Sequence, residues 1–116
     1  MTIERHRVGA RMSQAVAYGQ TVYLAGQVAD TPAAGVRQQT EEVLRKIDEL
    51  LAAAGTDNSK LLSATIWLCD MRHFDEMNAV WDAWVSAGNT PGRACVEARL
   101  AAPYWKVEIA VVAARE

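Results

Sequence analysis

The chain has 116 residues, 51% hydrophobic and 22% charged, a balance typical of one globular domain, which we expect to span residues 1–116. The formal net charge of −2 offers no basic field for nucleic-acid phosphates, so no nucleic-acid partner is expected. No apolar run is long enough to span a membrane and no signal peptide follows Met1, which predicts a cytoplasmic protein without membrane contact.

The first strands are predicted near the N-terminus. Thr2–Val8 is expected to be an edge strand. Residues 16–18 and 21–25 flank the Gly19-Gln20 turn and predict a hairpin. Gly26 follows, and a glycine there indicates a bulge or a close approach by a ligand or another backbone.

A helix is predicted from Val36, because apolar residues recur at helical spacing and Gly55 then provides a stop. The apolar face comprises Val36, Val43, Leu44, Ile47, Leu50, Leu51 and Ala54. The opposite, polar face comprises Glu41, Glu42, Arg45, Lys46 and Glu49.

A strand is predicted over Lys60–Cys69, with Leu62, Ala64, Ile66 and Leu68 on one face. Its other face holds Leu61, Ser63, Thr65, Trp67 and Cys69, which is also too apolar for free exposure. A second helix follows, with Asp70 as a candidate cap and with Gly88 and Asn89 at its end. The apolar stripe of this helix comprises Phe74, Met77, Trp81, Trp84 and Val85.

The stretch from Thr90 to Ala113 predicts a strand, a loop and a second strand. Because side chains alternate along a strand, Arg93, Cys95 and Glu97 are expected on one face of the first strand. Glu108 stands among apolar neighbours in the second strand. Both charges are costly to bury without partners, so chemistry is expected here.

The order of strands, helix, strand, helix and strands predicts an α+β fold. Two helices can cover only one face of such a sheet, yet several strands are apolar on both faces. Self-association is the simplest way to cover the second face.

Each candidate residue allows two interpretations. Arg93 could hold a substrate carboxylate through two parallel hydrogen bonds, or it could form a structural ion pair with Glu97 or Glu108. Glu108 could orient or activate a water, or it could be a buried partner for an arginine. Cys95 is a small wall residue or a nucleophile, although no histidine is placed to activate it.

Metal and cofactor chemistry is not expected. Cys69 and Cys95 fit neither a disulfide framework nor a metal-ligand spacing. The two histidines, His6 and His73, lie in no ligand-like cluster.

The pattern Pro91-x-Arg93-x-Cys95-Val96, a loop, and then Val107-Glu108-Ile109 resembles the signature of the Rid family, the YjgF-like reactive intermediate deaminases. Ser13-Gln14-Ala15-Val16, Leu24–Val28 and Asn78-Ala79 agree with it in order and spacing. The resemblance implies a chorismate-mutase-like fold, with a mixed sheet, two helices on one face, and a homotrimer around a central barrel. It places active sites in clefts between subunits.

The resemblance also implies the chemistry. Arg93 matches the family's residue for the substrate carboxylate, and Glu108 matches the glutamate that orients the attacking water. Cys95, Gly26 and Asn78 match pocket positions. The implied reaction hydrolyses a 2-imino (or enamino) acid, such as 2-iminopropanoate, to a 2-oxo acid and ammonium without a cofactor.

Two residues depart from the family pattern. Met12 replaces a tyrosine and Ala25 replaces a serine that border the pocket in well-known members. The loss of two hydroxyls leaves open an alternative, a non-catalytic trimer that binds or senses small carboxylates. Ribonuclease activity, attributed to some relatives, is disfavoured by the acidic net charge.

Overall fold

A six-stranded mixed sheet, in the order β1-β2-β3-β6-β4-β5, forms the centre of the computed structural model, which describes residues 1–116. All neighbouring strands are antiparallel except β4 and β5, which are parallel. The strands are β1 (Ile3–Val8), β2 (Ser13–Tyr18), β3 (Thr21–Leu24), β4 (Leu61–Leu68), β5 (Gly92–Glu97) and β6 (Val107–Ala114). The helices are α1 (Val36–Ala53) and α2 (Phe74–Trp84), with short 3₁₀ helices η1 (Asn58–Lys60) and η2 (Met71–His73).

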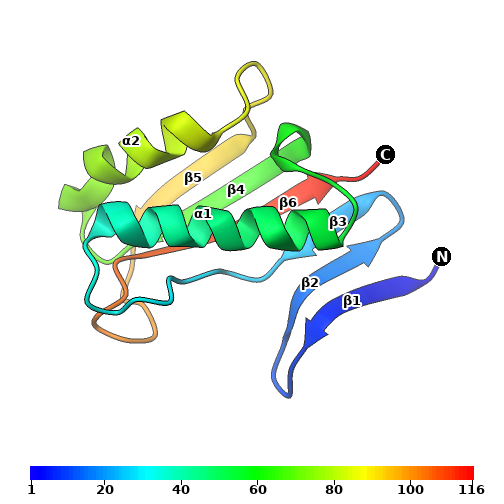
Figure 1. Cartoon of the computed structure of the whole chain (residues 1–116), viewed down its shortest axis with the longest axis horizontal. Helices are drawn as coiled ribbons and strands as arrows, with labels where there is room; N and C mark the ends of the chain where they lie inside the picture. The colour runs from blue at the N-terminus through cyan, green and yellow to red at the C-terminus, as the bar shows by residue number, and fades with distance from the viewer.

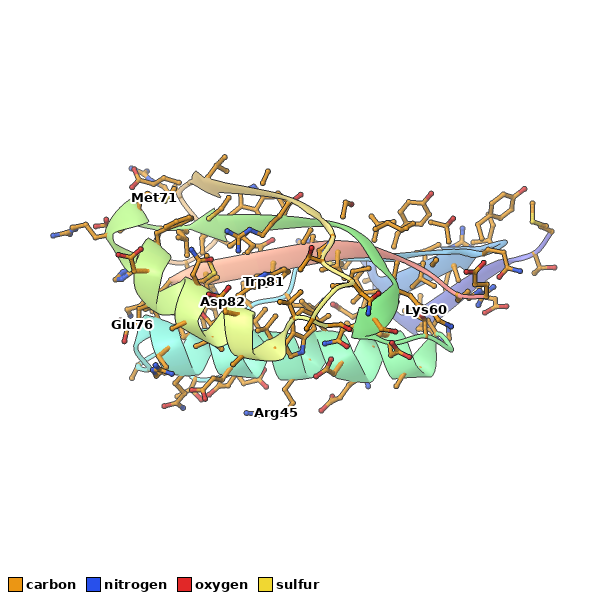
Figure 2. The ribbon with its side chains drawn as sticks, turned by 90° about the horizontal axis from the view of Figure 1, so that it is seen from above. Arg45, Lys60, Met71, Glu76, Trp81 and Asp82 are labelled. Carbon is orange, nitrogen blue, oxygen red and sulfur yellow. The ribbon has the colours of Figure 1, made fainter.

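Both helices pack on the same face of the sheet, and no element covers the opposite face (Figures 1 and 2). The prediction of one helix-covered face is therefore confirmed. The β1–β2 hairpin extends past the helices at one end, while the parallel strand β5 forms the other edge beneath α2 (Figure 1). Neither helix is long and apolar enough to cross a membrane.

The core lies between the helices and the covered face. In β6 every second residue is fully buried beneath α1, whereas the residues between them are half-buried on the other face. The predicted apolar face of α1 is confirmed, because all seven of its residues are buried. Gly55 ends the helix in the left-handed region, at φ 84°, as a helix stop requires.

Three sequence predictions need correction. Leu62 is 54% exposed, whereas Leu61 is buried, because a register shift between Leu61 and Ser63 moves the start of β4 by one position. Asp70 caps η2, so α2 itself starts without a side-chain cap. That helix ends at Trp84, ahead of the predicted stop at Gly88.

The prediction for Glu42 also needs correction. Helical spacing places it on the polar face of α1, but the residue is buried. Its carboxylate accepts hydrogen bonds from the backbone N–H groups of Asp30 and Thr31, from the Thr31 hydroxyl and from Gln38. These bonds, led by the one from Gln38, lower the pKa of Glu42 to about 2. Glu42 therefore fastens the loop after β3 to α1.

The uncovered face of the sheet, here called the open face, carries mainly apolar and small side chains. Strand register places on it Val16, Tyr18, Tyr23, Thr65, Trp67, Ala94, Val96, Ala110 and Val112. Tyr18, Tyr23 and Val96 are 48%, 50% and 46% exposed. An exposed sheet face that is mainly apolar is typical of an interaction site.

Candidate functional site

Arg93 lies on the edge strand β5 and turns its side chain toward α2. Its Nη1 donates a hydrogen bond to Asn78 Oδ1 at 2.8 Å. The guanidinium carbon lies over the rings of Trp81 and Phe74, 5.4 and 5.9 Å from their centroids. No carboxylate lies within ion-pairing distance of Arg93, and its side chain is exposed. Most of its donors therefore remain free for an anion.

The sequence of α2 explains how these contacts arise. Phe74, Asn78 and Trp81 are spaced i, i+4 and i+7, which brings them to one side of a helix. Positions 77, 80 and 81 face the core, so this side lies next to the sheet edge. An amide acceptor and two aromatic rings thus surround the guanidinium from a single helix.

Cys95 shares the covered face with Arg93, as the alternation along β5 predicts. It lies opposite Ile66 in the parallel ladder, and its side chain packs against the hydrophobic core. Burial raises the pKa of the Cys95 thiol, although the nearby Arg93 charge opposes the shift. A half-buried thiol with a raised pKa is a poor nucleophile, so the geometry favours a wall residue.

Glu108 projects from β6 onto the open face. It lies opposite Trp67 on β4, and its carboxylate packs directly on Gly26. A Cβ on Gly26 would lie 2.1 Å from Glu108 Oε2, so the close approach at Gly26 is made by a side chain of the same chain and not by the ligand or backbone that the sequence predicts. Burial raises the pKa of Glu108, and none of the hydrogen bonds or ion pairs within the chain uses its carboxylate.

Gly26 is held in place by the residues on either side of it. Ala25 N donates to Gln14 O, and Gln27 exchanges two backbone hydrogen bonds with Ile109. The buried Gln27 side chain donates to Gln14 Oε1 and to Ala25 O. The backbone beside the Glu108 carboxylate is therefore fixed between β2 and β6.

Met12, the other position that departs from the family pattern, lies in the turn between β1 and β2. Its carbonyl accepts a hydrogen bond from Gly9 N, and its side chain is 53% exposed.

Arg93 and Glu108 lie on opposite faces of the sheet. Arg93 is the register partner of Ala64, and Glu108 is the register partner of Trp67. These two β4 residues are three positions apart, so their side chains point to opposite faces, and Ala64 is the one buried under the helices. The structure thus brings Arg93, Asn78 and Cys95 together in one group and Glu108, Gly26 and Ala25 in another.

These two groups are here called the Arg93 half-site and the Glu108 half-site. A single chain cannot join them across its own sheet. The same geometry excludes an ion pair between Arg93 and Glu108 within one chain, which was one of the two interpretations of these residues. Glu97 also forms no ion pair with Arg93, and its carboxylate instead accepts a hydrogen bond from Met71 N.

Sequence reasoning missed two groups of residues in these half-sites. Helical spacing predicts Trp81 and Phe74 only as part of the apolar stripe of α2, although their spacing from Asn78 also indicates a place beside Arg93. The part that Gln27 plays in holding Gly26 had no signal in the sequence, because it depends on the pairing with Ile109. No cluster of three or more His, Cys, Asp and Glu side chains is arranged to hold a metal ion.

The largest cavity, of about 430 Å³, lies outside both half-sites. It is lined by Cys69, Glu97, Ala98, Arg99, Leu100, Ala102, Pro103 and Trp105.

Comparison with known proteins defines the class to which this fold and these half-sites belong. The model of the Endoribonuclease L-PSP family, which describes the YjgF-like Rid proteins, matches residues 2–115. The chain belongs to this family, and the resemblance inferred from its motifs is confirmed.

The particular relatives fall into two groups. A "RutC family protein" of Haemophilus ducreyi is 46% identical over 112 residues, covering 97% of this chain and 96% of the relative. The crystal structure of a YjgF family member from Neisseria meningitidis matches with a TM-score of 0.96 and 46% identity, covering 100% of this chain and 97% of that one. At greater distance, the "2-iminobutanoate/2-iminopropanoate deaminase" of Mus musculus is 31% identical over 107 residues, or 87% of this chain and 78% of the relative.

Proposed function

We propose that the protein hydrolyses 2-imino acids to 2-oxo acids and ammonium in a homotrimer, whose sites form where the Arg93 half-site of one subunit meets the Glu108 half-site of the next. One observation carries the proposal. Each half-site holds a charged group with no charged partner in its own chain, and the two lie on opposite faces. A neighbouring copy is the simplest means of bringing them together.

The open face supports the oligomer on separate grounds. Its apolar side chains cover the sheet surface that the two helices leave free, and burying that surface in an assembly is favourable. An assembly that covers this face would also enclose Glu108 further.

Arg93 acts on the substrate carboxylate. The planar guanidinium can donate two parallel hydrogen bonds to it, which orients the C=N carbon and rejects compounds that lack the anion. Asn78 accepts from one nitrogen and thereby helps to fix the side chain.

Glu108 acts on the water. As the water oxygen bonds to the imine carbon, the carboxylate accepts the water proton and the C=N electron pair moves to nitrogen. Glu108 returns this proton to nitrogen, which gives a tetrahedral carbinolamine. The intermediate then collapses: Glu108 carries the hydroxyl proton to nitrogen, the C–N bond breaks, and the carbon–oxygen bond becomes a carbonyl. Nitrogen leaves as ammonia, which takes a proton from solvent to become ammonium. A pKa raised by burial suits this role, because it brings proton affinity closer to the working pH.

The relatives support the same reaction without establishing it for this chain. The mouse protein that bears the imine deaminase name is 31% identical, while the more similar Haemophilus ducreyi protein carries only a family name. The identity of the reaction therefore rests on an assay.

The assay generates 2-iminopropanoate from alanine with an amino-acid oxidase and follows its disappearance. The protein should accelerate hydrolysis, and Arg93→Ala should lower kcat/KM by about ten- to several-hundred-fold, since it removes charge-assisted hydrogen bonds worth about 1.5–3 kcal/mol each. Arg93→Lys should recover little, because a point charge cannot replace the planar guanidinium. Light scattering should report about three times the 12.7 kDa chain mass.

Two outcomes contradict the proposal. A monomer at micromolar concentration removes the composite site. A folded Arg93→Ala variant with parental activity removes the carboxylate anchor.

A second candidate function is a trimer that binds small carboxylates without catalysis. The observation favouring it is that Met12 and Ala25 offer no hydroxyl to substrate or water, while the Arg93 half-site is unaffected by these changes. The oxidase assay separates the two functions. Binding of a 2-oxo acid without any acceleration of imine hydrolysis would establish the binding protein.

A further inference from the structure

The Arg93 side chain is exposed on an edge strand, yet its guanidinium contacts three side chains of α2. Long exposed side chains sample many rotamers, and ordering one costs up to about 2 kcal/mol. Asn78 holds only one of the five N–H groups of the guanidinium. The remaining support comes from the two aromatic rings of α2.

Trp81 is the stronger of these two supports. Its ring centroid lies 5.4 Å from the guanidinium carbon, against 5.9 Å for Phe74. Tryptophan also gives the strongest cation–π attraction of the aromatic residues. Trp81 is 4% exposed, so its ring is fixed by the core and cannot follow a moving arginine. Figure 2 shows Trp81 on the side of α2 that faces the sheet.

Trp81 is in turn packed against a second tryptophan that is tied to α1. The Trp84 ring lies 5.3 Å from the Trp81 ring, tilted by 52°. Trp84 Nε1 donates to both carboxylate oxygens of Asp48, each at 3.0 Å. The aromatic support therefore runs from α1 through α2 to the edge of the sheet.

We infer that Trp81 is a positioning residue for anion binding: it holds the Arg93 guanidinium by a cation–π contact so that its free N–H donors point away from the core toward an incoming carboxylate. The inference rests on the proposed role of Arg93 and adds a second residue to it. A support that fixes the guanidinium before the anion arrives removes part of the ordering cost from binding.

The test measures the dissociation constant of pyruvate, used as the carboxylate probe, by calorimetry on the assembled protein. Trp81→Leu should weaken pyruvate binding by about 2- to 30-fold, the range that a lost cation–π contact gives between exposed and desolvated settings. Trp81→Tyr and Trp81→Phe should recover part of this affinity, since their rings still attract the cation. In turnover, KM should rise in the same order while kcat changes little.

A double-mutant cycle separates positioning from stability. In an Arg93→Ala background, Trp81→Leu should cause no further loss of pyruvate affinity, although it should still lower the melting temperature. The control Trp105→Phe alters a tryptophan that contacts neither Arg93 nor α2 in the interactions described, and it should leave the dissociation constant unchanged. Should Trp81→Leu fail to fold, the tyrosine and phenylalanine variants carry the test, because each retains a ring in the core.

The outcomes distinguish this inference from the proposed reaction. Equal pyruvate affinity in the parent and in the folded Trp81 variants overturns the positioning role and leaves the deaminase proposal intact. Affinity that depends on Trp81 in a protein with no imine hydrolysis supports the inference and overturns the deaminase proposal. A parent that does not bind pyruvate at all overturns the inference together with the carboxylate anchor.

Discussion

Gly26→Ala is the most direct probe of the Glu108 half-site. The added Cβ would lie 2.1 Å from Glu108 Oε2, 3.0 Å from its Cδ and 3.2 Å from its Cγ. A carbon and an oxygen in contact need more than 3 Å, so the carboxylate has to move by about 1 Å. The backbone itself tolerates alanine, because Gly26 does not have a positive φ angle.

The effects on stability and on activity should therefore differ. Replacing glycine at a compatible site stabilises the fold by about 0.4–1 kcal/mol, and forcing Glu108 off its rotamer costs about 0.5–1.5 kcal/mol. The two nearly cancel, so the free energy of unfolding should change by less than about 1 kcal/mol. A catalytic group displaced by about 1 Å can lose about 10²-fold in rate.

The assay compares kcat/KM and the melting temperature of the parent, Gly26→Ala and a matched control. Gly35→Ala is that control, since a Cβ at Gly35 meets no atom within 4 Å. Glu108→Gln should lose activity, and adding Gly26→Ala to it should cost little more. The reasoning is refuted if Gly26→Ala retains parental kcat/KM, or if its activity falls only in proportion to a large loss of stability.

Three further predictions test separate residues. Cys95→Ser should fold and keep most of its activity, with a stability cost of about 1 kcal/mol, whereas a covalent adduct on the thiol during turnover would overturn its assignment as a wall. Met12→Tyr combined with Ala25→Ser should raise turnover, because each restored hydroxyl can add a hydrogen bond worth about 0.5–1.5 kcal/mol. A folded double variant no faster than the parent would show that these two positions do not limit turnover. Glu42→Gln should destabilise the protein by about 1–2 kcal/mol after solvent screening. Because the folded pKa of Glu42 is lowered to about 2, the stability difference between parent and variant should be full above pH 4.5 and should vanish as the pH falls toward 2. Urea titrations in which this stability difference does not depend on pH would contradict the prediction.

The spacing of apolar residues predicted most of the fold, because the side-chain period of a helix or strand is set by its own backbone geometry. The buried face of α1, the β2–β3 hairpin and the shared face of Arg93 and Cys95 follow from periods of 3.6 and 2.0 along the chain. The errors at Leu62 and Glu42 have non-local causes. A register shift against β6 reverses the start of β4, and the loop at Asp30 turns back onto α1 to bind a glutamate that periodicity assigns to solvent.

The relation between the two half-sites could not be predicted from the sequence alone. Alternation gives the face of Arg93 within β5 and of Glu108 within β6, but not whether those faces coincide. That depends on how both strands pair with β4, one in parallel and one antiparallel. The motif resemblance names Arg93 and Glu108 as candidates, and the strand register places them on opposite faces of the sheet.

Because Arg93 and Glu108 lie on opposite faces of one chain, the pKa of Glu108 can show whether the two charges pair across a subunit interface. In one chain, burial raises its pKa above 4.5, so its contribution to stability is present below that value and is lost as the pH rises through the folded pKa. A guanidinium delivered into direct contact by a neighbouring subunit would reverse the shift, because an opposite charge favours the carboxylate. In the proposed reaction, substrate and water lie between the two groups, so the guanidinium does not contact the carboxylate and the pKa of Glu108 stays raised. The fall in kcat/KM on the acid side of the pH profile should therefore lie above pH 4.5. A limb below that pH would mean that the two charges pair across the interface and hold subunits together, and Glu108 would then be a structural residue.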